Sequence, residues 1–233
     1  MRKAFFSSIV LLPIFVLQSF LHIQDKPESP LETVLHKLDA TAARFDTAQA
    51  DFVWDQYEKV VDEHDLQKGT VYYRRAGKSV EMMAEIKEPD RKYVLYKDGT
   101  VQIYQPKIEQ VTDYSAGKNR SELESFLVLG IGGSGQDLVK TYDVTYAGEE
   151  RTDNVTTAKL ELVPKSEKVR NTISKIVLWI DLSQGISVKQ QFLQPQGDWR
   201  TAQYSAIRLH QKIPGEVFRL KTTSKTQFVS PGG

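Results

Sequence analysis

Hydrophobic and polar positions follow a helical period near the start of this chain and a strand period after it. Between residues 31 and 45, leucine, valine, alanine and phenylalanine recur every three or four positions, which predicts a helix over Pro30–Phe45. Ser29 is placed to cap the helix, because a proline follows it and Glu32 stands three residues further on.

From Ala48 onward the period changes to two. It is clearest at Val80, Met82, Ala84 and Ile86, which alternate with charged residues and predict a strand with one apolar face. Similar patterns predict about eleven strands in all, one of them over 108–113 and the last at 217–220. A second helix is predicted over 119–129, and the glycine-rich run after it should act as a flexible stop that leads into a strand.

Consecutive strands joined by short turns form antiparallel sheets, and a sheet of this size curls. The predicted fold class is therefore α+β and mainly β. It is a curled antiparallel half-barrel of about eleven strands, with the helices covering its concave face.

Composition narrows the function. The chain has 233 residues, 40% of them hydrophobic, which suits one domain with a substantial core. The net charge is +1 and acidic and basic residues are interspersed, so the sequence shows no basic patch of the kind that binds nucleic acid. The chain contains no cysteine, so disulfides, thiolate metal sites and cysteine nucleophiles are excluded.

The amino terminus has the pattern of an export signal. Arg2 and Lys3 precede an apolar run over 4–17, and we expect residues 1–23 to be a cleavable signal peptide. Residues 24–30 would be a short tether and 31–233 a single domain. The alternative is an uncleaved membrane anchor that reaches Ile23.

No pattern in the sequence indicates catalysis. Gly130, Gly132 and Gly135 match a dinucleotide fingerprint by spacing, but a helix rather than a strand is predicted before them. The turn at 62–65 is rich in acidic residues and histidine but has no second cluster with ligand spacing. We therefore expect no enzyme activity, no cofactor and no metal.

Five segments between Leu31 and Phe228 resemble the periplasmic lipoprotein carriers of bacteria, the LolA family. The hairpin over 98–111, with its Asp-Gly turn and Tyr-x-Pro break, is the most specific. The segments are Ala50-Asp51-Phe52, Gly69–Arg75, Asp98–Val111, Leu123–Gly130 and Val217–Leu220.

This resemblance implies a half-barrel that binds acyl chains and catalyses nothing. The implied partners are acylated lipoproteins or other lipid, an inner-membrane release complex and an outer-membrane acceptor. In the family an arginine after the second strand holds the lid shut by hydrogen bonds to its carbonyl groups. Arg75 matches that residue and Arg74 is the competitor, although Ala76 stands where the family usually has proline.

A set of apolar residues on the predicted strands and lid helix would line the cavity. The competing interpretation is that they are ordinary core. They are Phe52, Trp54, Val71, Tyr73, Val80, Met82, Ile86, Ile103, Phe126, Leu127, Ile176 and Leu178.

The sequence thus predicts a periplasmic carrier that shuttles lipoproteins towards the outer membrane. The alternative is a membrane-anchored lipid-binding or sensory module of the same fold that does not move cargo.

Overall fold

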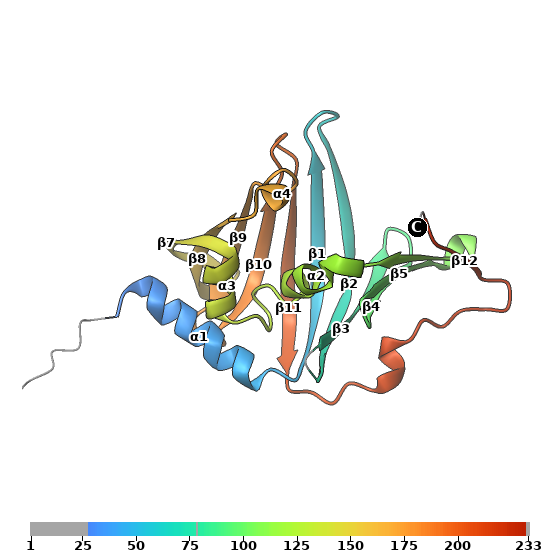
Figure 1. Cartoon of the computed structure of the whole chain (residues 1–233), viewed down its shortest axis with the longest axis horizontal. Coiled ribbons are helices and arrows are strands. Elements are labelled where there is room, and N and C mark those ends of the chain that lie inside the picture. Colours follow the sequence, from blue (N-terminus) through green and yellow to red (C-terminus); the bar gives the residue numbers. More distant parts are fainter. Residues whose placement is uncertain (1–27, 78, 232–233) are drawn as a thin grey trace, which may run out of the picture.

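The computed structural model describes residues 28–77 and 79–231, which form a single curled sheet of twelve strands with short helices (Figure 1). The strands are β1 (Thr47–Glu58), β2 (Glu63–Ala76), β3 (Ser79–Glu88), β4 (Lys92–Lys97), β5 (Thr100–Gln105), β6 (Gln110–Ser115), β7 (Tyr142–Thr152), β8 (Val155–Pro164), β9 (Lys175–Asp181), β10 (Ile186–Leu193), β11 (Trp199–Leu209) and β12 (Gln227–Val229). The helices are α1 (Pro30–Arg44), α2 (Arg120–Leu127), α3 (Gly135–Thr141) and α4 (Glu167–Arg170), with 3-10 turns η1 (Pro106–Ile108), η2 (Gly117–Asn119) and η3 (Gly215–Phe218).

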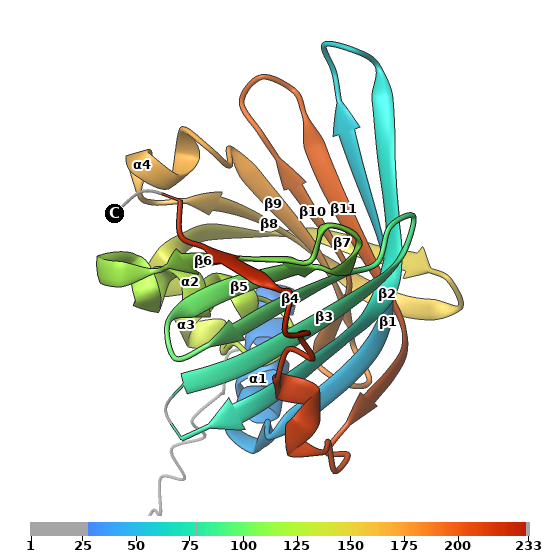
Figure 2. The same cartoon turned by 90° about the vertical axis from the view of Figure 1, so that its right-hand side faces the viewer.

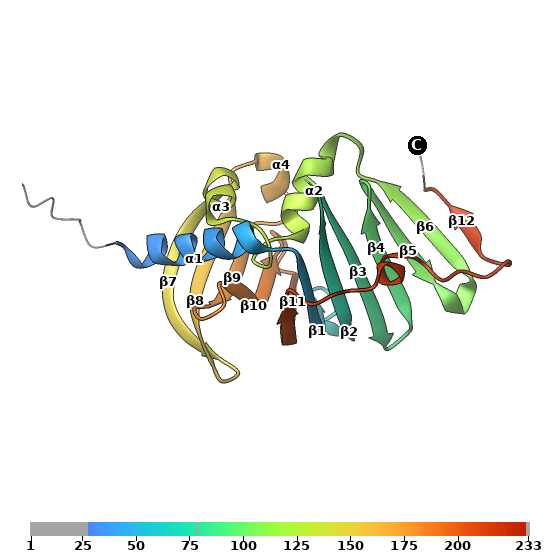
Figure 3. The ribbon, with the colours of Figure 1, turned by 90° about the horizontal axis from the view of Figure 1, so that it is seen from below.

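The strand order is β12-β6-β5-β4-β3-β2-β1-β11-β10-β9-β8-β7. Every neighbouring pair is antiparallel except β12 and β6, which run parallel. The sheet stays open, with β7 and β12 at its edges, and Figures 2 and 3 show how it curls with α1, α2 and α3 on one face. The fold class expected from the sequence is therefore confirmed.

Helix α1 begins where the sequence predicts. The Ser29 hydroxyl accepts a hydrogen bond from the Glu32 backbone N–H, and the Glu32 carboxylate accepts one from the Ser29 N–H, which completes a capping box. Val34 and Leu38 are buried beneath the helix against an apolar cluster on strands β8 to β10. The amphipathic pattern of the sequence thus places α1 across one half of the sheet.

The concave face of the other half carries a second apolar cluster. It draws alternate residues from β1, β2, β3 and β11, including Phe52, Val71, Met82 and Tyr204. Because side chains alternate along a strand, the intervening residues of β3 point to the convex face. There Met83, 1% exposed, packs against Phe218 of η3. The sheet is therefore buried on both faces around β3.

The predicted final strand over 217–220 is wrong. Residues 215–218 form the turn η3, because the segment lies across the convex face (Figure 2). There Phe218, 1% exposed, packs beside Met83. The last strand is β12, which begins at Gln227 and pairs with the sheet edge at β6.

Two features near turns differ from the sequence expectation. The strand predicted after the glycine-rich run is present as β7 from Tyr142, but the sequence did not predict helix α3 before it, whose first turn is capped by the Ser134 hydroxyl. The strand expected from Ile108 begins at Gln110, because residues 106–108 form a 3-10 turn and Glu109 adopts a left-handed conformation with φ 49°.

The predicted signal peptide over 1–23 and residues 24–27 of the predicted tether lie outside the described residues. In the part of the chain that the structure describes, no helix is long and apolar enough to span a membrane.

Candidate functional site

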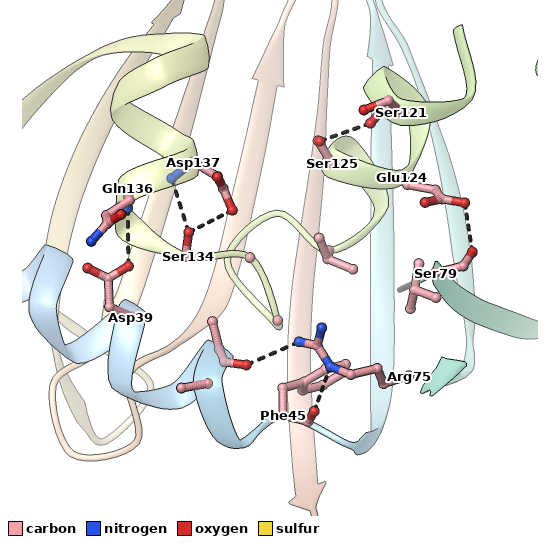
Figure 4. Close-up of a pocket in the computed structure, with 16 residues that line it drawn as sticks. Asp39, Phe45, Arg75, Ser79, Ser121, Glu124, Ser125, Ser134, Gln136 and Asp137 are labelled. Carbon is pink, nitrogen blue, oxygen red and sulfur yellow. Dashed lines mark hydrogen bonds between the residues drawn. The ribbon is translucent and has the colours of Figure 1, made fainter. Parts of the chain in front are cut away.

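Two hollows lie on opposite sides of helix α2. One side of the helix faces a groove of about 560 Å³ that extends to α1 (Figure 4). The side chains on this side are Ser121, Glu124 and Ser125, together with Val128 just after the helix. The other side of the helix, through Phe126 and Leu127, faces a smaller pocket of about 120 Å³. Helix α2 therefore separates a polar groove from a mainly apolar pocket, whose polar lining comes from Gln190 and Arg200.

The smaller pocket, which we call the inner pocket, contains half of the predicted cavity residues. The Phe126 ring of α2 packs on Phe192 of β10 with centroids 5.0 Å apart. The pocket thus spans the concave face from β3 to β10 beneath the helix. The predicted residues that line it are Trp54, Val71, Tyr73, Met82, Phe126 and Leu127.

The other predicted cavity residues are distributed differently. Val80 lines the polar groove, and Phe52 stacks on Trp54 with ring centroids 4.3 Å apart. Ile86 is buried in the same cluster as Phe52, whereas Ile103 of β5 is only half-buried. Ile176 and Leu178, each 0% exposed, belong to the separate cluster beneath α1.

Arg75 binds carbonyl groups at a helix end, but the helix is α1. Its Nε donates to the Phe45 carbonyl oxygen at 2.8 Å, and its terminal nitrogen donates to that of Ala42 at 3.1 Å (Figure 4). A cation at a helix carboxyl terminus is also favoured by the helix dipole. Arg75 therefore ties the end of β2 to α1, and both of these hydrogen bonds lie away from α2.

Arg74 points to the convex face. It forms an ion pair with Glu81 and lies 4.3 Å above the Phe218 ring. Burial raises the pKa of Glu81, but the hydrogen bonds from Arg74 and Lys97 outweigh it, so the pKa lies below its ordinary value. Of the two arginines, Arg75 is thus the one placed to act on the concave side.

The sequence interpretation missed the group that holds α2 to the sheet. The Glu124 carboxylate accepts hydrogen bonds from the Tyr96 hydroxyl at 2.6 Å, the Ser79 hydroxyl at 2.7 Å and Arg120 Nε at 2.9 Å. Burial raises the pKa of Glu124, but these donors outweigh it and the pKa is lowered. Burial and the neighbouring carboxylate raise the pKa of Tyr96 to about 12.

The glycine-rich run is closely packed against its neighbours. A Cβ atom on Gly132 would lie 2.9 Å from the Phe45 ring, and one on Gly135 would lie 2.5 Å from the Leu35 carbonyl oxygen. The loop is also bonded to β10, since Gln190 Nε2 donates to the Leu129 carbonyl oxygen at 2.6 Å. These glycines allow the loop to approach α1 closely.

Among the described residues, no three histidine or acidic side chains are grouped so that they could hold a metal ion. In the 62–65 segment, Asp62 accepts a hydrogen bond from Tyr57 and His64 Nδ1 lies 2.8 Å from Asp55. The hairpin tip therefore uses its polar groups for local contacts.

These features define a curled half-barrel with an apolar concave face and a short helix over it. A family model described as "-like: Uncharacterized protein" matches residues 78–227, more than half of the chain, and the protein belongs to that family. No curated protein matches the sequence.

The fold matches several solved structures. An uncharacterized conserved protein from Thermus thermophilus is similar at 12% identity over 84% of this chain and 96% of that chain, with TM-score 0.54. MucB is similar at 16% identity over 84% of this chain, with TM-score 0.52, and the match spans only 64% of the MucB chain. A LolA superfamily protein from Nitrosomonas europaea matches at 17% identity over 82% and 97% of the two chains, with TM-score 0.40. At these identities the first two similarities establish the fold alone.

Proposed function

We propose that this protein is a periplasmic carrier that binds the acyl chains of lipoproteins on its concave face and moves them towards the outer membrane. The observation that carries the proposal is the inner pocket, where apolar side chains from the sheet and from α2 surround an unfilled volume. The proposal includes no catalytic step.

The energetic basis is the hydrophobic effect. An acyl chain in water costs about 0.8 kcal/mol for each methylene group, so a carrier must enclose most of the chain. The inner pocket, at about 120 Å³, accommodates only part of a long chain. Loading therefore requires α2 to move outward and take Phe126 and Leu127 with it.

The attachment of α2 suits such a movement. Its described hydrogen bonds to the sheet come from two side chains: Glu124 accepts from Ser79 of β3 and Tyr96 of β4, and Arg120 donates to the Ser79 hydroxyl at 3.2 Å. Met82 lies in the pocket floor, and its flexible thioether can adapt to chains of different shape. We infer that α2 is the lid and that Glu124 holds it closed.

The remaining parts of the proposal come from the sequence. The pattern over 1–23 supports export by a cleavable signal, and the family resemblance supports an inner-membrane release complex and an outer-membrane acceptor as partners. The alternative is an anchored lipid-binding or sensory module, which would retain the amino terminus and carry no cargo between membranes.

Mass spectrometry of the protein purified from its native envelope tests this function. We expect acylated lipoprotein or lipid to copurify with wild type and to be lost in Leu127→Glu, which places a charge in the inner pocket. Val139→Glu is the matched control, because Val139 is 38% exposed on the neighbouring helix α3. A wild-type protein free of any acylated molecule would contradict the proposal, and an intact amino terminus in washed membranes would favour the anchored alternative.

A further inference from the structure

The inner pocket is lined by an arginine as well as by apolar side chains. Arg200 of β11 lies there together with Trp54, Phe126 and Phe192. The strand register explains why: Arg200 is two residues from Ala202 and four from Tyr204, so all three point to the concave face. The guanidinium lies 5.6 Å from the Phe192 ring centroid and 5.9 Å from that of Trp54.

No carboxylate compensates this charge within the described part of the chain. None of the salt bridges among the described residues includes Arg200. Asp65 is in register on the same face, but β1 separates the two residues, and the Asp65 carboxylate accepts a hydrogen bond from Gln67. The crowding of protein atoms around the guanidinium lowers the pKa of Arg200.

Arg200 as a whole residue is nevertheless exposed, so solvent and ligands reach it. Its position therefore combines an accessible cationic head with apolar walls that extend inward beneath α2. A charge in such surroundings is stabilised by an anion that brings its own hydrogen-bond acceptors. Guanidinium groups bind carboxylates and phosphates in a planar, two-point geometry.

We propose that the inner pocket binds single-chain anionic amphiphiles, with the acyl chain beneath α2 and the carboxylate or phosphate head on Arg200. This inference rests on the proposed function, because it uses the same pocket. It narrows the chemical class of the cargo to lipids with a negatively charged head group. The acyl groups of a lipoprotein are neutral esters and amides, whereas a fatty acid or an alkyl phosphate presents an anion that can pair with Arg200.

The proposal is tested by measuring how well three ligands displace the fluorescent fatty acid cis-parinaric acid. Calorimetry then gives the affinity of each ligand that displaces it. The ligands are palmitate, hexadecyl phosphate and hexadecanol, which share a sixteen-carbon chain and differ in the head group. A hydrogen-bonded ion pair contributes roughly 10- to 100-fold in affinity. We expect wild type to bind both anions at least about tenfold more tightly than hexadecanol.

The variant Arg200→Gln should lose this preference and keep its affinity for hexadecanol, and Arg200→Lys should restore most of it. Arg208→Gln, an exposed arginine on the same strand outside the inner pocket, is the matched control. Preference for palmitate alone or hexadecyl phosphate alone identifies the head group and supports the proposal.

Two results overturn the inference, and they can be told apart. If wild type binds all three ligands equally, or Arg200→Gln keeps the preference for anions, the anion site is wrong while the lipid-binding function stands. If wild type binds none of the three, the proposed lipid-binding function fails as well.

Discussion

The buried Tyr96 hydroxyl of β4 donates a 2.6 Å hydrogen bond to the Glu124 carboxylate of α2. This contact joins the helix that covers the concave face to the sheet beneath it. Ser79 of β3 donates to the same carboxylate oxygen at 2.7 Å, so the helix is held from two neighbouring strands. If α2 opens as we propose, it must break a small set of charge-assisted hydrogen bonds together.

Removing the Tyr96 hydroxyl should loosen the lid. The variant Tyr96→Phe leaves Glu124 with one donor fewer and should cost about 1.5–3 kcal/mol of unfolding free energy, the usual range for a hydrogen bond to a charged group. It should also accelerate dissociation of a bound acyl probe in stopped-flow fluorescence. Tyr114→Phe, at a tyrosine 47% exposed, is the control and should change neither. Equal dissociation rates in both variants would contradict a lid held by Glu124.

The Glu124 contacts should make stability depend on pH in the acid range. The pKa of Glu124 in the folded protein lies below the ordinary value of 4.5, so the unfolded chain takes up the proton first as the pH falls. The stabilisation is complete above pH 4.5 and is lost as the pH falls through the folded-state pKa.

Urea unfolding of wild type and Glu124→Gln between pH 7 and pH 3 measures this effect. The two midpoints should differ most near neutral pH and approach each other below about pH 4.5, the ordinary pKa of the group. A constant difference across the range would mean that the carboxylate charge does not contribute.

The two neighbouring arginines should have separable effects. Arg75→Leu removes two hydrogen bonds to carbonyl oxygens at the end of α1, next to the polar groove. These bonds do not reach α2, but their loss should loosen α1 from the end of β2 and shift the equilibrium towards the open, loaded state by about tenfold. We expect more lipid to copurify with Arg75→Leu than with wild type. Arg74→Leu removes contacts on the convex face and should lower stability without changing the lipid content. Equal lipid in all three proteins would exclude Arg75 as a latch.

The carboxyl-terminal segment should stabilise the sheet from its convex side. Phe218→Ala removes a ring that is 1% exposed against Met83 and Leu95, and should cost about 3–5 kcal/mol in chemical unfolding. Phe228→Ala, at a phenylalanine 61% exposed on the edge strand, is the matched control and should change stability by less than about 0.5 kcal/mol. Similar losses in both variants would mean that η3 does not cover the core.

Packing of the glycine loop against α1 gives a further test. In Gly132→Ala the new methyl group would lie 2.9 Å from the Phe45 ring, and the loop or α1 must shift to admit it. Overpacking of this kind typically costs about 1–3 kcal/mol. An unchanged melting temperature in calorimetry would show that the loop can shift to admit the methyl group without loss of stability.

Several parts of the molecule follow from local periodicity in the amino-acid sequence. Helix α1 with its Ser29 cap, the apolar face of β3 through Val80 and Met82, and the antiparallel order of most strands all follow from spacing over a few residues. These features are set by where each Cβ atom points along a helix or strand, which sequence alone specifies.

Other features depend on partners that are distant in the sequence, and they could be read only from the folded chain. Residues 217–220 have a strand-like pattern, yet residues 215–218 form a turn in which Phe218 packs against Met83 on the convex face. Arg74 and Arg75 are adjacent in sequence and lie on opposite faces, so their roles follow from Glu81 on one side and α1 on the other. Similarly, Glu124 meets Tyr96 across 28 residues, and Arg200 enters an apolar pocket through strand pairing. Such contacts are fixed only when the curled sheet brings separate strands together, because no short-range pattern records them.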